Sequence, residues 1–318
     1  MKVLFHIKDL AKRRNEIIEL MKGHEVDIAD EETVKEKIAL VDVLVTRPSS
    51  GVPTEVLHGA HNLKMQQQMG AGLENLDLDA CRELGIIVCN VPSRGTGNAE
   101  SVAEIALLHM LLQGRKYALA QENARMGKFF SPAGVSLWRK TACVVGLGNL
   151  GRTITNRLAA MGMNVRGVNR SPGPSDSDLK EMGIREFFTI ERLREAVRGC
   201  HFVIATLAFN DETRGIFDES FFQAMGAESF FINVARGGLV VEEALIRALD
   251  EKRLAGAGLD VLAQEPPRLN NPLLNHPQIT LTPHIGAMTD ESFMGIMNFI
   301  CENVDRLSRG EEPRARIV

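Results

Sequence analysis

The feature that most constrains this chain is a set of three spaced glycines, Gly146-x-Gly148-x-x-Gly151. An apolar, strand-like segment at 142–145 precedes it, and a helical pattern at 152–161 follows it. In a strand-to-helix turn of this kind, the first glycine permits the sharp bend and the second lets the backbone approach a pyrophosphate. The third lets helix and strand pack closely. The N-terminus of the helix attracts the anion. The pattern therefore favours a dinucleotide site, and a glycine-rich turn without a ligand is the alternative.

The rest of the chain alternates β-rich runs with helical stretches, which is typical of doubly wound α/β folds with parallel sheets. Because 318 residues are too many for one ordinary core, we expect two domains. We expect the last helical stretch, which ends near residue 308, to return to the first domain, and the tail 311–318 to be loose. Strands are expected at 3–7, 26–29, 41–46, 62–68, 86–88, 142–145, 165–168, 202–207, 230–234, 255–259 and 279–282.

A long helix is expected between the two α/β regions. Asn98 can cap its start with the side-chain oxygen, and Gly114 is placed to end it. The residues in between are apolar on most faces, so we expect deep burial between domains or between subunits.

Charge and cysteine content narrow the partners. A net charge of −4 with dispersed Lys and Arg gives no basic surface for nucleic acid. The five cysteines are scattered without a Cys-x-x-Cys pair, so we expect neither disulfides nor a metal site, and a reducing cytoplasm fits them. Lys8 and Asp9 interrupt the first apolar run, so we expect no signal peptide, and no other run is long enough for a membrane span.

Polar residues follow three expected strands near the C-terminus. Arg236 follows the strand at 230–234, Asp260 and Glu265 follow the next, and His284 follows the last. The carboxyl ends of parallel strands are where open α/β sheets bind ligands. A guanidinium suits a carboxylate, and a histidine beside a carboxylate suits proton transfer near neutral pH. Taken singly, the alternatives are a helix-capping Arg, a solvated Glu and a loop His.

Two further segments could bind anions. Gly70-Ala71-Gly72 lies between a strand and a helical stretch, where exposed backbone N–H groups could hold an anion, although a plain turn is equally compatible. Asn169-Arg170-Ser171 lies eighteen residues after Gly151, where an NAD enzyme carries an acidic residue for the ribose. A neutral Asn followed by Arg favours the 2′-phosphate of NADP, and a polar turn in solvent is the alternative.

The chain resembles the D-isomer specific 2-hydroxyacid dehydrogenases, a family that includes phosphoglycerate dehydrogenases and glyoxylate/hydroxypyruvate reductases. The resemblance covers nearly the whole chain. It is carried, in order, by DVLVTRPSSGVPTEVLHGAHNLK, GAGLENLDLDACRELGIIVCNVP, GNAESVAEIALL, INVARGGLVVEEAL, GAGLDVLAQEPP and LTPHIGAMT. It implies a Rossmann-type cofactor domain at 95–288, inserted into a flavodoxin-like substrate domain formed by 1–94 and 289–318, with the active site in the cleft between them. It also implies a homodimer.

The resemblance assigns roles to individual residues. Arg236 would bind the carboxylate and carbonyl of a small 2-keto or D-2-hydroxy acid, His284 would be the acid/base, and Glu265 its partner. Asp260 would support Arg236 or the nicotinamide side. Substrate contacts would come from Arg47, Ala71, Gly72 and Asn98. The cofactor site would include Gly146, Gly148, Asn149, Leu150, Gly151, Asn169, Arg170, Ser171, Thr206, Leu207, Thr213, Val234, Ala235, Asp260, His284 and Gly286.

The chain departs from the family pattern in places. Leu207-Ala208-Phe209 stands where many members have Leu-Pro-Leu, and His201 replaces a usual acidic residue. NAESVAE resembles the formate dehydrogenase branch, but that branch carries Gln where this chain has Glu265. Glu265 favours a 2-hydroxy acid enzyme, and with the Asn169-Arg170 pair we expect an NADPH-dependent reductase of glyoxylate or hydroxypyruvate type. The alternatives are a cofactor-sensing, corepressor-like binding protein and a formate- or phosphite-type dehydrogenase.

Overall fold

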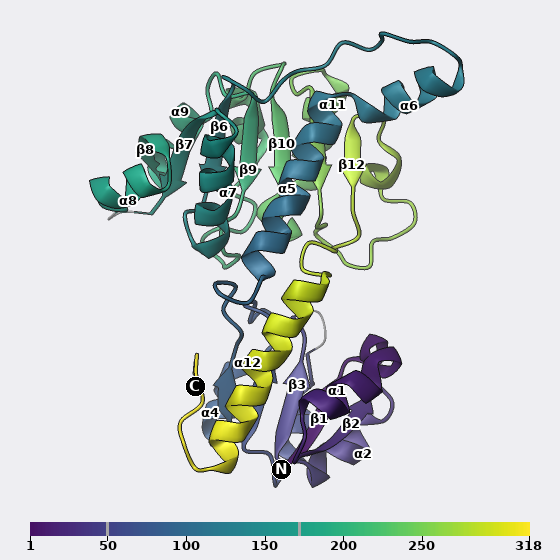
Figure 1. The fold of residues 1–318 in the computed structure, drawn as a ribbon, viewed down its shortest axis with the longest axis vertical. Helices are drawn as coiled ribbons and strands as arrows, with labels where there is room; N and C mark the ends of the chain where they lie inside the picture. Colours follow the sequence, from purple (N-terminus) through teal and green to yellow (C-terminus); the bar gives the residue numbers. More distant parts are fainter. Residues whose placement is uncertain (49–50, 171–172) are drawn as a thin grey trace. The chain divides into compact units, whose positions relative to one another are not determined.

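The computed structural model describes residues 1–48, 51–170 and 173–318. The chain divides into two compact units: unit 1 comprises Met1–Asn98 and Thr289–Val318, and unit 2 comprises Ala99–Met288 (Figure 1). Within the described residues no helix has the length and apolar character needed to span a membrane.

Unit 1 is built on a parallel sheet with the strand order β2-β1-β3-β4-β5, the flavodoxin-like order. Alternate residues of β1 enter different cores: Phe5 packs with α1 and α12, while Leu4 packs with α3 on the opposite face. Its strands are β1 (Lys2–His6), β2 (Glu25–Ala29), β3 (Val43–Thr46), β4 (Met65–Gln68) and β5 (Ile87–Cys89). Its principal helices are α1 (Arg14–Leu20), α2 (Val34–Lys37), α3 (Thr54–His58), α4 (Leu78–Glu83) and α12 (Asp290–Ser308).

The C-terminal tail is ordered, which corrects the expectation that it is loose. The Ile317 N–H donates to the Val88 carbonyl (2.7 Å), and Arg316 forms an antiparallel bridge with Cys89. The buried Asn303 of α12 donates to the Arg314 carbonyl (3.0 Å). The tail therefore pairs along β5, at the edge of the sheet. The charged residues of the tail give no apolar strand pattern. The pairing was therefore not predicted, because backbone hydrogen bonds do not depend on side-chain polarity.

Unit 2 is a seven-stranded parallel sheet with the order β12-β11-β10-β9-β6-β7-β8. Counted from β6, this is the Rossmann order with one further strand beside β11. The two-domain α/β fold predicted from the sequence is confirmed. The strands are β6 (Thr141–Val145), β7 (Asn164–Asn169), β8 (Ile184–Thr189), β9 (Phe202–Ala205), β10 (Phe230–Asn233), β11 (Gly256–Leu259) and β12 (Ile279–Leu281). β8 was not predicted, because exposed Arg185 and Glu186 interrupt its apolar pattern on the sheet edge.

Helices cover both faces of the unit 2 sheet. One core joins Val144 and Ile204 to α5 and α7, and the other joins Val145 and Val203 to α10 and α11. The helices are α5 (Asn98–Gly114), α6 (Tyr117–Arg125), α7 (Asn149–Ala160), α8 (Asp176–Glu181), α9 (Leu193–Ala196), α10 (Glu219–Ala224) and α11 (Glu242–Asp250).

Helix α5 crosses the sheet at close range over β11 (Figure 1). A Cβ atom added to Gly258 would lie 2.4 Å from the Cβ of His109, and one added to Gly256 would lie 2.3 Å from Oε1 of Gln113. The alternate glycines of β11 therefore accept two polar side chains spaced one helical turn apart. The helix was expected to be buried on most faces, but within this chain Leu108 and Leu111 are about two-fifths exposed.

Candidate active site

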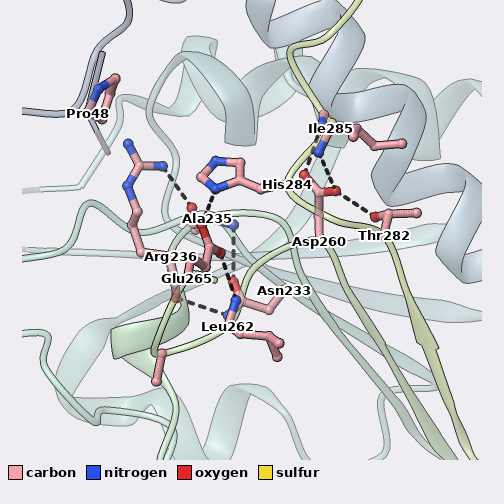
Figure 2. Close-up of polar contacts among 12 residues, drawn as sticks. Pro48, Asn233, Ala235, Arg236, Asp260, Leu262, Glu265, Thr282, His284 and Ile285 are labelled. Carbon is pink, nitrogen blue, oxygen red and sulfur yellow. Dashed lines mark hydrogen bonds and ion pairs between the residues drawn. The ribbon is translucent and has the colours of Figure 1, made fainter. Parts of the chain in front are cut away.

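Three neighbouring strands bring the predicted catalytic residues together. β10, β11 and β12 are adjacent and parallel, so their carboxyl ends lie at one edge of the sheet. Arg236 follows β10, Glu265 follows β11 and His284 follows β12. Figure 2 shows the side chains of these three residues grouped at that edge. A sheet of parallel strands therefore gathers residues that are up to 48 positions apart in the sequence.

His284 and Glu265 form a direct pair. Nδ1 of His284 lies 2.6 Å from Oε2 of Glu265, and the other carboxylate oxygen accepts the Leu262 N–H at 2.9 Å (Figure 2). Burial raises the pKa of Glu265, but the hydrogen bonds from His284 and the Leu262 N–H outweigh it, with the charge of Arg236 adding to them. The pKa of Glu265 therefore lies below its usual value. The carboxylate fixes the Nδ1–H tautomer, which leaves Nε2 of His284 for chemistry.

Arg236 is positioned by the residues around its turn. The buried Asn233 at the end of β10 accepts the Ala235 N–H and donates to the Arg236 carbonyl. Gly237 lies so close to the next loop that an added Cβ would fall 1.9 Å from the Leu262 carbonyl carbon. The turn therefore packs directly on the loop that carries Glu265. One guanidinium nitrogen donates to the Ala235 carbonyl at 2.8 Å.

Asp260 organises the turn that carries His284. It is buried, and its Oδ1 accepts the Thr282 hydroxyl (2.5 Å) and the Ile285 N–H (3.0 Å). Its Oδ2 accepts the Gly286 N–H at 2.9 Å, and its carbonyl accepts the His284 N–H at 2.8 Å. The sequence led us to expect that Asp260 supports Arg236 or the nicotinamide side. These bonds hold the turn at 284–286, where His284 has a φ of +52°, and the expected role stays a prediction.

The three glycines of the predicted dinucleotide turn have three distinct environments. Gly146 has a φ of +107°, and an added Cβ would lie 2.8 Å from the Thr206 carbonyl. An added Cβ on Gly151 would lie 1.9 Å from the Gly146 carbonyl oxygen, whereas Gly148 is exposed and has nothing within 4 Å of that position. Gly148 stands at the N-cap of α7, which makes no side-chain cap. This geometry fits a pyrophosphate beside Gly148 and the first turn of α7.

The other residues of the predicted cofactor site follow the carboxyl ends of strands of the same sheet. Asn149 and Leu150 begin α7, and Gly286 lies in the turn held by Asp260. The Thr206 hydroxyl donates to the Gly146 carbonyl at 2.6 Å, which ties β9 to the glycine turn. Leu207 is buried, as are Val234 and Ala235 after β10, and the Thr213 hydroxyl donates to the Ala208 carbonyl within its own loop (2.8 Å).

The end of β7 carries the residues predicted to distinguish NAD from NADP. Asn169 is the last residue of β7 and is half-buried, and the exposed Arg170 follows it. Arg170 forms an ion pair with Glu212 at 3.5 Å, with both side chains more than two-thirds exposed. Ser171 lies outside the described residues. The pair shows that a carboxylate lies within reach of the guanidinium, an interaction that the sequence did not indicate.

The predicted substrate contacts other than Arg236 lie in unit 1. The half-buried Arg47 follows β3, and Asn98 is the first residue of α5. Ala71 and Gly72 lie in the loop after β4. Their carbonyls accept hydrogen bonds from the side chains of Asn90 (3.0 Å) and Gln68 (3.0 Å), which fixes the loop on the sheet.

Sequence reasoning missed the residues that support the turns carrying Arg236 and His284. Asn233 ends a strand that is otherwise apolar, and that contrast was a usable signal. Thr282 and His109 carried no such signal. They contact each other across 173 residues of sequence, so only the packing of α5 on the sheet shows the relationship.

The chain is similar to known proteins in both sequence and fold. Residues 107–286 match the sequence model described as the D-isomer specific 2-hydroxyacid dehydrogenase, NAD binding domain. A D-3-phosphoglycerate dehydrogenase of Methanocaldococcus jannaschii is 33% identical over 90% of this chain and 54% of its own length. The chain thus spans about half the length of the phosphoglycerate dehydrogenases that it matches.

Two other relatives match over nearly their whole length. A glyoxylate reductase of Pyrococcus furiosus is 31% identical over 94% of this chain and 90% of its own length. The apo-structure of D-lactate dehydrogenase from Escherichia coli superimposes with a TM-score of 0.85 at 25% identity, covering both chains fully.

Proposed function

This chain belongs to the D-isomer specific 2-hydroxyacid dehydrogenase family, and we propose that it transfers a hydride between a nicotinamide cofactor and a small 2-keto or D-2-hydroxy acid. The observation that carries the proposal is the His284–Glu265 pair beside Arg236, at the edge of the sheet that also bears the glycine turn. A protein that only senses the cofactor would not need an acid/base pair there.

The proposed chemistry divides among three side chains. The guanidinium of Arg236 holds the substrate carboxylate and carbonyl with its planar fork. The bound nicotinamide supplies or accepts the hydride. Nε2 of His284 gives a proton to the carbonyl oxygen as it becomes a hydroxyl, and takes it back in the oxidation direction. Glu265 keeps the imidazole in the required tautomer.

Four residues of unit 1 are further proposed substrate contacts. The backbone N–H groups of Ala71 and Gly72 are suited to the substrate carboxylate, because a loop fixed by side-chain bonds presents its donors without further ordering. Arg47 and Asn98 are assigned to the substrate by the family pattern alone. We propose glyoxylate or hydroxypyruvate as the substrate class, a choice supported by the Pyrococcus furiosus relative that is named a glyoxylate reductase.

We further propose that NADPH is preferred over NADH. Asn169 at the end of β7 lacks the carboxylate that would bond the ribose hydroxyls and repel a 2′-phosphate. The neighbouring Arg170 is exposed and can bind a 2′-phosphate. Glu212 competes with the phosphate for Arg170. An exposed ion pair of this kind is worth only about 0–1 kcal/mol, so a phosphate can displace it. The preference should therefore be a bias rather than an absolute choice.

A homodimer is the proposed assembly. Exposed large apolar side chains occur in the second half of α5, on α6 and in the segment after it. Figure 1 shows α6 and that segment reaching beyond the body of unit 2. Such a concentration of exposed apolar surface is typical of an interface. The residues are Leu108, Leu111, Tyr117, Leu119, Met126, Phe129, Phe130 and Trp138.

The described cysteines form no disulfide, which supports a reducing, cytoplasmic location.

The test of the proposed function is turnover. We expect oxidation of NADPH, followed at 340 nm, with at least one of glyoxylate, hydroxypyruvate and pyruvate, and slower oxidation of NADH. Formate and phosphite with the oxidised cofactors serve as the contrasting substrates. Binding of NADPH without turnover of any keto acid would favour a cofactor-sensing protein instead.

A further inference from the structure

A histidine that the proposed chemistry does not use lies inside unit 2. His109 of α5 is fully buried, and its two ring nitrogens contact two threonine hydroxyls: Nδ1 lies 2.8 Å from Oγ1 of Thr280, and Nε2 lies 3.0 Å from Oγ1 of Thr282. Gly258 provides the space for the imidazole against β11. Losing either hydrogen bond would leave a buried ring nitrogen unsatisfied, which is costly. The two threonine hydroxyls therefore constrain the orientation of the ring.

The direction of each hydrogen bond follows from the carboxylate at the end. Both oxygens of Asp260 accept backbone N–H groups, so the carboxylate acts as an acceptor and the Thr282 hydroxyl donates to it. Thr282 Oγ1 must then accept from His109, which places the ring proton on Nε2. Nδ1 is left to accept the Thr280 hydroxyl. Burial lowers the pKa of His109 to about 4, although the charge of Asp260 opposes this, so the ring carries one proton.

The result is one continuous chain of donors. It runs from the Thr280 hydroxyl through the His109 ring to the Thr282 hydroxyl, and ends at Asp260 Oδ1. Asp260 in turn accepts the N–H groups of Ile285 and Gly286, on the turn that carries His284. Hydrogen bonds aligned in one direction polarise each other, so each strengthens the next.

We propose that His109 is a positioning residue for His284, acting through Thr282 and Asp260. The proposal rests on the proposed function, because it assigns His109 to the geometry of the acid/base. His109 touches neither His284 nor Glu265 through any of these bonds. It sets the orientation of the Thr282 hydroxyl, which holds the carboxylate that fixes the 284–286 turn and thereby the approach of His284 to Glu265.

The first test is a double-mutant cycle on turnover. His109→Leu removes the ring donor and Thr282→Val removes the hydroxyl with little change of shape. Each should lower kcat by about tenfold, the worth of one hydrogen bond to a charged group, with KM and cofactor affinity nearly unchanged. Because both act through one chain, the double variant should be no worse than the poorer single variant. Multiplied effects in the double variant would overturn the proposal.

Conservative variants separate positioning from packing. Thr282→Ser keeps the hydroxyl, and His109→Gln places an amide donor at about the reach of Nε2, so both should retain most of the activity. His201→Gln is the matched control, because His201 is a half-buried histidine of unit 2 whose Nδ1 accepts the Thr141 N–H of β6 at 3.4 Å, away from the His109 chain. Thr282→Ser as poor as Thr282→Val would show that volume, not the hydroxyl, matters, and would contradict the proposal.

A measurement without turnover keeps the proposal distinct from the proposed function. With 15N-labelled histidine, and with His284→Ala used to assign the signal, the neutral His284 ring of the wild type should show a single Nδ1–H tautomer. In His109→Leu and Thr282→Val the same signal should average between tautomers, because the turn no longer holds the ring on Glu265. An unchanged His284 signal in both variants overturns the positioning role, whereas absence of keto-acid turnover in the wild type contradicts only the proposed function.

Discussion

Nδ1 of His284 lies 2.6 Å from Oε2 of Glu265, and the same carboxylate accepts the Leu262 N–H through its other oxygen. The pair is therefore anchored to the loop after β11, and among the described residues no hydrogen bond occupies Nε2 of His284. This arrangement suits a histidine that must both give and take a proton, because the carboxylate fixes the ring without occupying its reactive nitrogen.

Glu265→Gln should weaken both catalysis and the pH dependence of folding. The amide oxygen can still accept the Leu262 N–H, but the charged bond to His284 is lost, which should lower kcat by about 10- to 100-fold. The pKa of Glu265 is lowered on folding from 4.5, so its carboxylate contributes stability above pH 4.5. That contribution is lost as the pH falls through the lower folded value. Urea unfolding of both proteins between pH 7 and pH 3.5 checks this: the wild-type advantage should shrink only below about pH 4.5.

Arg236→Lys should damage turnover although the charge is kept. Lysine cannot reproduce the two parallel donors of the guanidinium, and a lost charged hydrogen bond is worth about 1.5–3 kcal/mol. We expect kcat/KM for the keto acid to fall by at least about tenfold, while the affinity for NADPH, measured by fluorescence, stays the same. Arg214→Lys, an exposed arginine of the same unit, is the control. A variant with nearly normal kcat/KM would leave Arg236 a purely structural role.

Cofactor preference should respond to both partners of the exposed ion pair at the end of β7. Asn169→Asp combined with Arg170→Ala should shift the ratio of kcat/KM for NADPH over NADH downward by about 10- to 100-fold. Glu212→Gln should shift it upward, because the carboxylate no longer competes for Arg170. A wild type that already prefers NADH, or a ratio that neither change moves, would refute this assignment.

The buried His109 should make folding sensitive to mild acid. Its pKa falls from 6.5 to about 4 on folding, so the unfolded state binds the proton first as the pH is lowered. Above pH 6.5 the ring is neutral in both states, so its burial adds no pH-dependent cost. The free energy of unfolding falls as the pH drops from about 6.5 to about 4. Between pH 7 and 4.5 the wild type should lose roughly 2–3 kcal/mol more than His109→Gln.

The single tryptophan makes this measurable in the relevant unit. Trp138 lies in unit 2, so its fluorescence follows the unfolding of the part that contains His109. Parallel pH dependences for wild type and variant would show that the ring is not held neutral by burial.

Much of the fold was predictable because its signals are local. Apolar runs such as those of β3 and β10 mark buried parallel strands, and Gly146, Gly148 and Gly151 mark the turn between β6 and α7. β8 escaped because it is an edge strand with charged residues. The C-terminal tail escaped because it is held by backbone bonds to β5, which have no side-chain signature.

The candidate site was predictable only in part, for a related reason. The topology of a parallel sheet places Arg236, Glu265 and His284 at one edge, and that consequence can be drawn from the sequence. The hydrogen bonds that hold these three residues cannot be predicted from the sequence, because the bonds join groups from separate elements. Thr282 and Asp260 follow different strands, and His109 reaches Thr282 from α5 only because Gly258 has no side chain.

Transfer of deuterium tests the central claim most directly. NADPH that carries deuterium at the transferred position of C4 should be incubated with hydroxypyruvate. Any other keto acid that the protein reduces to a chiral product would also serve. The account predicts a product with one deuterium at C2 and the D configuration, formed about 10² to 10⁴ times more slowly by His284→Ala. A product without deuterium or with the L configuration, or an equal rate in His284→Ala, would contradict it.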